Sequence, residues 1–257
     1  MLIRCLMIIW LTVTLSGCAA LGTYNAATGR RELIFISTPE EISMGQTIHQ
    51  QLMKTEKLSK DQAVIDRVKR IGQKLVLVSD RQDYQYNFYV IEKKDLNAFT
   101  TPGGSIYIYT GLLDKLKNDD EVAAVLAHEI GHCAARHTIK KYQAALGYDF
   151  VDDIVLNRLN LGSNIKQIAS LSSQALSSLV FSAYSRSDEF QADLLGLKYL
   201  DLSRYDLNGM IGTFEVLEKE DVKGGAPSFL RSHPYIKDRI KAVKEQIAVM
   251  RPAGGNS

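Results

Sequence analysis

The chain contains few cysteines, tryptophans and prolines: its 257 residues include 3 Cys, 1 Trp and 5 Pro. No C-x-x-C pair and no glycine-rich phosphate loop occurs, which argues against a dithiol redox centre and a nucleotide-binding loop. The net charge of +2 lacks the basic excess that binds nucleic acid, so no nucleic-acid partner is expected. With 46% hydrophobic and 23% charged residues, the composition is that of a globular protein with one large or two small domains.

The apolar run at the N-terminus is too short to span a bilayer. Arg4 is the only charge before apolar residues 6–13, which is the pattern of an export signal. The following Leu15-Ser16-Gly17-Cys18 resembles a bacterial lipobox, in which cleavage precedes the cysteine and lipid is added to its thiol. An ordinary signal peptide that is cut nearby is the alternative.

The lipobox predicts a signal peptide over 1–17, lipidation of Cys18, and a lipid-anchored tether over 18–38. Ala19 stands where an Asp would resemble an inner-membrane retention signal, so we expect the outer membrane, with the protein facing the periplasm. The mature chain would then keep Cys133 as its one free thiol, and no structural disulfide is expected.

Residues 128–132 read His128-Glu129-Ile130-Gly131-His132, an H-E-x-x-H motif. At about 100° per residue, the two histidines share one helical face, where both can bind one Zn²⁺. Glu129 lies beside them as a candidate general base. The motif can occur by chance, but a chance match need not fall in a helix with an N-cap. Here Asn118 is a suitable N-cap, and three acidic residues follow it.

Three further residues near the motif receive structural interpretations. His137 lies about 180° from His128 on a continuous helix, so it is not expected to be a ligand from that helix. Cys133 is expected to pack as a small apolar residue, and Gly131 to make room for a neighbouring backbone.

A catalytic zinc usually has three protein ligands, and Glu189 is the best third candidate. Asp193 follows it by four residues and shares its helical face. A carboxylate at this place can accept the free N–H of a ligating histidine and fix its tautomer. The alternative is a solvated acidic helix face.

Helices are predicted over 39–55, with Thr38 as N-cap, and over 60–78. Strands are predicted over 84–91 and 105–110, and the second is interpreted as a substrate-binding edge or as an ordinary hairpin strand. The uncharged segment 168–185 predicts a packed amphipathic helix; a lid that touches the membrane and a true membrane span are the alternatives. Whether residues 145–184 form a lid over the site or touch the membrane is left open by the sequence. The main domain is expected over 39–250, and the tail 251–257 is expected to be disordered.

In combination, these motifs resemble the M48 peptidases, a family of zinc metallopeptidases. The resemblance rests on H-E-x-x-H, Asn97-Ala98-Phe99, Pro102-Gly103-Gly104, the segment 186–193, and Ser232-His233-Pro234 before Arg239. The chain lacks multiple membrane spans and room for a TPR domain, so it is most similar to short periplasmic lipoprotein members such as LoiP and YcaL. This implies an α+β, mostly helical zincin (gluzincin) domain with a small β-sheet beside the active-site helix.

The resemblance also implies a set of site residues. One Zn²⁺ per chain would be bound by His128, His132 and Glu189, with Glu129 as the base. His233, with Arg239 behind it, would stabilise the oxyanion or act as an inhibitory fourth ligand; a loop histidine packed against its neighbouring proline is the alternative. Substrate would bind at Asn97, Ala98, Gly103, Gly104 and Ile106.

The resemblance implies an endopeptidase that hydrolyses unfolded or misassembled cell-envelope proteins, with complexes to outer-membrane assembly machinery or other envelope proteases among its partners. One rival is a zinc-containing chaperone or assembly factor with little proteolysis, although such a binder has no need of Glu129. A second rival is a cell-wall amidase, but no cell-wall-binding repeat is present.

Overall fold

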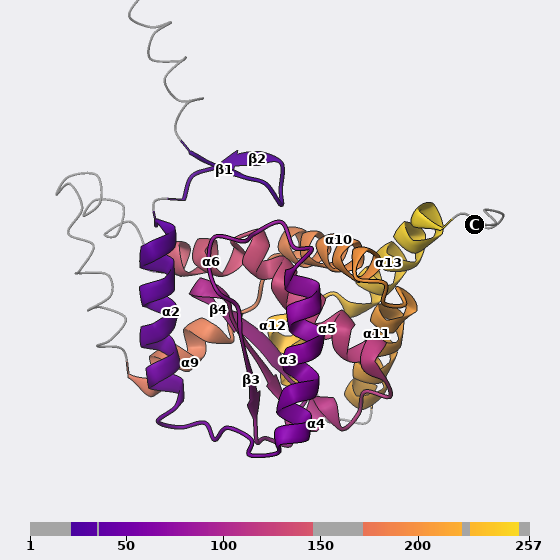
Figure 1. The fold of residues 1–257 in the computed structure, drawn as a ribbon, viewed down its shortest axis with the longest axis horizontal. Coiled ribbons are helices and arrows are strands. Elements are labelled where there is room, and N and C mark those ends of the chain that lie inside the picture. The colour runs from indigo at the N-terminus through magenta and orange to yellow at the C-terminus, as the bar shows by residue number, and fades with distance from the viewer. Residues whose placement is uncertain (1–21, 35, 146–171, 223–226, 252–257) are drawn as a thin grey trace, which may run out of the picture.

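The computed structural model describes residues 22–34, 36–145, 172–222 and 227–251. Helices dominate these residues and surround a three-stranded sheet, with a separate two-stranded hairpin, so the predicted α+β, mostly helical fold is confirmed (Figure 1). The elements are β1 (Thr23–Asn25), β2 (Arg30–Glu32), α2 (Thr38–Leu52), α3 (Gln62–Val76), β3 (Asn87–Ile91), β4 (Ala98–Thr101), η1 (Pro102–Gly104), β5 (Ser105–Tyr109), α4 (Thr110–Leu113), α5 (Asp119–Ala134), α6 (His137–Ala145), α9 (Ser173–Val180), α10 (Arg186–Leu202), α11 (Asn208–Glu220), α12 (Ser228–Ser232) and α13 (Ile236–Met250).

The sheet has the strand order β3-β5-β4. β3 runs parallel to β5, with Phe88 opposite Ile106, and β4 runs antiparallel to β5, with Phe99 opposite Tyr107. The prediction that 105–110 forms a substrate-binding edge is therefore wrong, because β5 has a hydrogen-bonded strand on each side. Alternation in the sequence identifies a strand but not its neighbours. Among the described strands of this sheet, β3 and β4 are its edges, and β4 packs beside α5.

Alternate residues of the strands enter two apolar clusters on the two faces of the sheet. Phe88 and Ile106 pack with α3 and α5 on one face. On the other face, the His49 ring of α2 stacks on Tyr89 at 4.4 Å between centroids, and Phe99 stacks on Tyr107 at 4.7 Å. Figure 1 shows α2 and α3 on opposite sides of the sheet. Both faces are thus covered, and α5 is held between the sheet and the C-terminal helices.

α5 is buried over nearly its whole length. Its predicted N-cap is confirmed: the Asn118 Oδ1 atom accepts a hydrogen bond from the Glu121 backbone N–H at 2.9 Å. The interpretation of Gly131 is also confirmed. A Cβ at this position would lie 2.8 Å from the carbonyl oxygen of Ala192, so the absence of a side chain lets α10 approach. Cys133 is buried, as expected.

α2 begins one residue earlier than predicted. Its N-cap is Ser37, and Glu40 closes the capping box, in place of Thr38 and Glu41. The Thr38 hydroxyl donates instead to the Asp83 carboxylate at 2.6 Å. The contact of Thr38 with Asp83, 45 residues away in the sequence, therefore leaves Ser37 as the N-cap. α2 and α3 also end a few residues before the predicted 55 and 78.

The described part of the predicted tether over 18–38 contains regular secondary structure. β1 and β2 form an antiparallel hairpin, and Ile34 and Ile36 are buried in the cluster beside α2. The Lys140 ammonium lies 2.6 Å from the Glu32 carboxylate and ties the hairpin to α6. The apolar pair therefore joins this segment to the domain. The predicted signal peptide 1–17, Cys18 and the tail beyond 251 lie outside the described residues.

Part of the uncharged segment 168–185 forms α9. Val180 at its end is buried and Leu179 packs beside it, whereas Gln174 and Ala175 are exposed. Packing thus involves the C-terminal end of α9, and residues 168–171 lie outside the described part. No helix in the described part of the chain is long and apolar enough to cross a membrane.

Candidate metal centre

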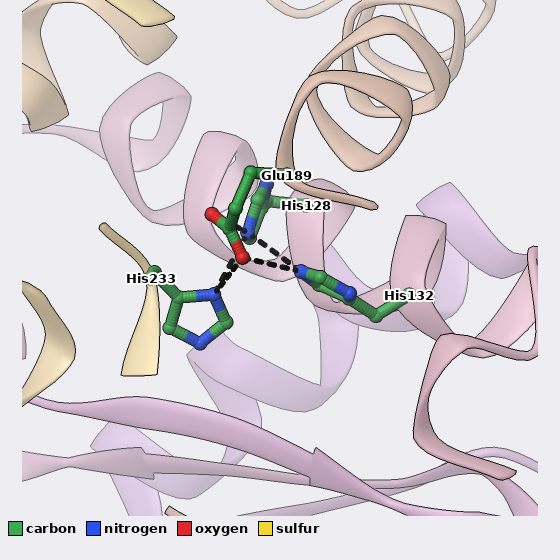
Figure 2. A group of neighbouring side chains, drawn as sticks. All are labelled: His128, His132, Glu189 and His233. Carbon is green, nitrogen blue, oxygen red and sulfur yellow. Dashed lines mark hydrogen bonds and ion pairs between the residues drawn. The ribbon is translucent and has the colours of Figure 1, made fainter. Parts of the chain in front are cut away.

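Four side chains from three parts of the chain converge beside the sheet (Figure 2). His128 and His132 come from α5, Glu189 from α10, and His233 from the residue after α12. One nitrogen or oxygen atom of each lies within 4.8 Å of the others. The Nε2 atoms of His128 and His132 are 3.0 Å apart. The sequence-predicted ligands are thus brought together, with His233 as a fourth member.

Close packing of α5 and α10 produces this convergence. Besides Gly131 on α5, α10 supplies Gly196, at which a Cβ would lie 3.3 Å from the backbone nitrogen of His128. Ser185 caps α10 by accepting from the Asp188 backbone N–H. The cap starts the helix one turn before Glu189, so this carboxylate is placed over the two histidines.

The donor set fits a zinc ion. Glu189 Oε1 lies 3.4 Å from His132 Nε2 and Glu189 Oε2 lies 3.6 Å from His128 Nε2, so donor atoms of three side chains surround one small space. Nitrogen ligands bind Zn²⁺ at about 2.0–2.1 Å, and two Nε2 lone pairs 3.0 Å apart repel unless a cation lies between them. Burial lowers the pKa of His132 well below its ordinary value, which keeps the ring in the neutral form that binds metal.

Asp193 and Arg239 support these ligands. His128 Nδ1–H donates to the Asp193 carboxylate at 2.9 Å, the contact predicted for a carboxylate one turn beyond Glu189. Arg239 donates to both oxygens of Asp193 at 2.7 Å, and its Nη1 atom lies 2.5 Å from Glu189. Burial alone would raise the pKa of Glu189, but the charges of Arg239 and His233 hold that pKa well below its ordinary value. Arg239 thus binds the ligand Glu189 and also Asp193, the carboxylate that orients His128; a catalytic role for it stays a prediction.

Glu129 lies next to the cluster and is fully buried. Neither of its carboxylate oxygens has a hydrogen-bond partner among the described residues. Burial raises its pKa to about 7, with a further increase from the charge of Glu189, against the lowering effect of His128. A carboxylate with free lone pairs and a pKa near neutrality is suited to exchange a proton.

His233 contacts the ligand cluster through Nδ1, which lies 3.0 Å from Glu189 and 3.2 Å from His128 Nε2. Its Nε2 atom lies 3.5 Å from the Glu129 carboxylate and has no hydrogen-bond partner in the described structure. The ring stacks on Phe229 at 4.3 Å between centroids. In this geometry His233 occupies the side of the cluster that a fourth ligand or a substrate carbonyl would use.

The cluster is enclosed: the exposed fraction is 3% for His128 and 0% for His132, Glu189 and His233. The Tyr184 ring covers His132, with 3.9 Å between ring centroids. Lys141 lies 4.0 Å above the Tyr184 ring and donates to the backbone carbonyls of Val180 and Ser182. A polypeptide therefore reaches the ligands only if this cover moves.

The residues predicted to bind substrate lie in and around the sheet. Asn97 and Ala98 lie at the start of the edge strand β4, and Ile106 lies in the central strand β5. Gly103 and Gly104 have positive φ in η1. Their contacts are with other parts of the fold: a Cβ would meet α2 at Gly103 and the Tyr84 ring at Gly104. Their role in substrate binding stays a prediction.

Sequence reasoning missed two contacts of His132, those with Tyr184 and with His137. The helical angle placed His137 away from the ligands, but α5 ends at Ala134 and the chain turns at Arg136, which has a φ of 57°. This turn returns His137 to the site, with its Nδ1 atom 3.0 Å from His132 Nδ1. The turn has no glycine to mark it, so the sequence carries no evident signal for this contact.

Comparisons with known proteins agree with the geometry. The description "Peptidase family M48" matches residues 62–247, a range that contains all four clustered residues. Mitochondrial metalloendopeptidase OMA1 of Schizosaccharomyces pombe is 29% identical over 179 residues, which cover 69% of this chain and 51% of that protein. Metalloprotease LoiP of Escherichia coli is 32% identical over 166 residues, covering 63% of each chain. The beta-barrel assembly-enhancing protease of E. coli is 24% identical over 222 residues, covering 84% of this chain and 46% of that one. The chain thus spans between 46% and 63% of the length of these relatives.

Proposed function

The chain belongs to peptidase family M48, and from this membership and its site geometry we propose that it is a zinc-dependent endopeptidase. One observation carries the proposal: the Nε2 atoms of His128 and His132 converge with Glu189, next to a Glu129 carboxylate that has no hydrogen-bond partner among the residues the structure describes. A binding protein would gain nothing from a buried, unpartnered carboxylate at this place, since burying it is costly.

Each residue then has a role in peptide hydrolysis. His128, His132 and Glu189 would hold one zinc ion, which when bound supplies a Lewis acid that polarises a peptide carbonyl and makes water more acidic. Glu129 would take a proton from the attacking water and pass it to the leaving amine. Arg239 and Asp193 would keep Glu189 and His128 in place through the contacts described above.

We propose that an extended substrate segment pairs with the edge strand β4. The Tyr109 backbone N–H donates to the Asn97 carbonyl at 2.9 Å, so the backbone of Asn97 faces β5. Because strand residues alternate, the N–H and C=O of Ala98 and Thr100 face the open side. Main-chain bonds to these groups would hold a peptide of variable sequence. Both residues are buried here, so pairing requires the same opening as access to the ligands.

We propose that His233 occupies the place of a fourth ligand in the enclosed conformation and that it leaves when substrate binds. Its Nδ1 contacts with Glu189 and His128 support this role. The other role, oxyanion stabilisation, predicts the opposite effect of a substitution. His233→Ala raises basal cleavage if the ring blocks the site and lowers it if the ring stabilises the oxyanion.

The proposed substrates are unfolded or misassembled cell-envelope proteins. The proposed location is the outer membrane, facing the periplasm, with a lipid anchor on Cys18; this rests on the lipobox-like Leu15-Ser16-Gly17-Cys18. The name of the E. coli relative, "beta-barrel assembly-enhancing protease", supports the same setting. Complexes with outer-membrane assembly machinery or other envelope proteases belong to this proposal.

The enclosure of the site favours one second candidate, a zinc-containing periplasmic chaperone or assembly factor with little proteolysis. Such a protein would use the metal to stabilise its fold, and a site whose ligands are between 0% and 3% exposed suits that use. The unpartnered Glu129 argues for the peptidase. The peptidase and chaperone functions are distinguished by comparing assembly of client proteins by the natural protein and by Glu129→Gln.

The first experiment measures bound zinc and casein cleavage for the full-length protein and for Glu129→Gln. About one zinc in each, with cleavage by the natural sequence alone, is the expected result. Zinc in both without cleavage in either favours the chaperone or a closed site, and His233→Ala separates these two explanations. Absence of zinc from both proteins would overturn the site assignment.

A further inference from the structure

His137, the first residue of α6, connects the ligand His132 to two polar side chains of α10. Its Nδ1 atom lies 3.0 Å from His132 Nδ1. Its Nε2 atom lies 2.9 Å from the Gln191 amide oxygen and 3.4 Å from the Asp188 carboxylate. The exposed fraction of His137 is 1%, so these contacts are made away from bulk water.

These contacts determine where the protons lie. The Asp188 carboxylate can only accept a hydrogen bond, so the neutral His137 ring carries its proton on Nε2. His137 Nδ1 is then an acceptor, and the facing Nδ1 of His132 must be the donor. With its proton on Nδ1, His132 presents the lone pair of Nε2 to the cluster. The opposite arrangement would place an N–H on Nε2, where it would exclude a metal ion.

We propose that His137 is a positioning residue that fixes the metal-binding tautomer of His132, with Asp188 and Gln191 setting the tautomer of His137 in turn. The inference rests on the proposed function, since it concerns the same zinc site. It gives each ligating histidine a defined acceptor: His128 donates to Asp193, and His132 donates to a neutral imidazole. Loss of such a partner typically weakens metal binding by roughly 10- to 100-fold.

Two substitutions test this role. His137→Phe keeps a ring of similar size but removes the acceptor, so His132 loses the partner that selects its tautomer. His137→Asn places a carbonyl oxygen near the position of Nδ1 and restores an acceptor. The matched control is His49→Asn, because His49 lies on the other face of the sheet, stacked on Tyr89. Thermal unfolding of each metal-free variant shows whether it is folded.

The first measurement is the zinc dissociation constant by competition with a chromogenic chelator. We expect His137→Phe to weaken binding by roughly 10- to 100-fold, and His137→Asn and His49→Asn to stay within a few-fold of the natural protein. Equal affinity of all three variants, or an Asn variant as weak as the Phe variant, would overturn the inference.

The second measurement needs no metal. Nitrogen NMR shifts of the imidazole rings report the tautomer, and the chain has only 5 histidines to assign. We expect His132 to carry its proton on Nδ1 in the metal-free natural protein. A proton on Nε2 would overturn the inference even if zinc binds. The expected tautomer in a protein that binds no zinc would instead count against the proposed function alone.

Discussion

Replacing Arg239 should destabilise the metal-free protein strongly, because this buried guanidinium is the ion-pair partner of two buried carboxylates. Its nitrogens lie 2.5 Å from Glu189 and 2.7 Å from Asp193, and its exposed fraction is 0%. Arg239→Met keeps the aliphatic stem and removes the charge. Removing one partner from a buried ion pair costs about 3–5 kcal/mol. For a chain of this size, that lowers Tm by roughly 6–20 °C.

The loss should depend on pH with a definite sign. The pKa values of Glu189 and Asp193 are both held below their ordinary values, so their favourable contribution is complete above the unfolded pKa values and is lost as pH falls through the folded ones. Without Arg239, burial is the dominant effect and raises the folded pKa values of Glu189 and Asp193. Mild acid then protonates both carboxylates, which removes the cost of burying their charges. The difference in Tm between the natural protein and Arg239→Met should therefore narrow from pH 7 to about pH 5.

The assay is thermal unfolding of the metal-free proteins at several pH values, beside a control, Arg251→Met. Arg251 pairs with Asp201 at 3.1 Å on the surface, where an ion pair contributes about 1 kcal/mol or less. Bound zinc should recover part of the loss, because a cation near Glu189 replaces part of the missing charge. A Tm for Arg239→Met no lower than that of the control, or a difference that does not narrow in acid, would refute the reasoning.

Three other substitutions give separate tests. Glu129→Gln should stabilise the metal-free protein at pH 8 by up to about 3 kcal/mol in urea unfolding and much less at pH 5, because burial raises the pKa of Glu129 to about 7 and its ionisation costs stability as pH rises. His233→Ala should raise basal casein cleavage, and a fall would favour oxyanion stabilisation. Gly131→Ala should cost about 1–3 kcal/mol and weaken zinc binding measured by competition, because its Cβ would lie 2.8 Å from the Ala192 carbonyl oxygen. An unchanged zinc affinity would contradict that account.

Features fixed by local chemistry could be predicted from the sequence. The cap at Asn118 and the shared face of His128 and His132 follow from a few consecutive residues. The start of α2 could not be predicted as well, because Ser37 and Thr38 each have a glutamate three residues later. Distant partners decide between them: Glu41 forms ion pairs with Arg81 and Arg136, at 2.8 Å and 3.1 Å, and is not free to close a capping box.

Features that depend on distant contacts could not be predicted. β5 is the central strand because β3 pairs with it on the side opposite β4. Alternation within residues 105–110 does not reveal this neighbour. The helical angle of His137 assumed that α5 continued, whereas the chain turns at Arg136. Arg136 is held there by the Ile36 carbonyl, to which it donates at 2.6 Å, and by Glu41. His137 is not among the clustered ligands, as predicted, but its contact with His132 and the place of β5 were both missed because a local pattern was extended past the point where tertiary contacts take over.

The burial of the metal ligands has a kinetic consequence. A small chelating molecule and a peptide face the same barrier, since both must displace the side chains above His132, including Tyr184. Release of a bound ion would then be no faster than the opening of this cover. The rate at which activity decays in excess chelator would then give a lower limit for the rate at which the cover opens. The time constant of this decay should shorten in any variant, such as Lys141→Met, that loosens the segment over the metal centre.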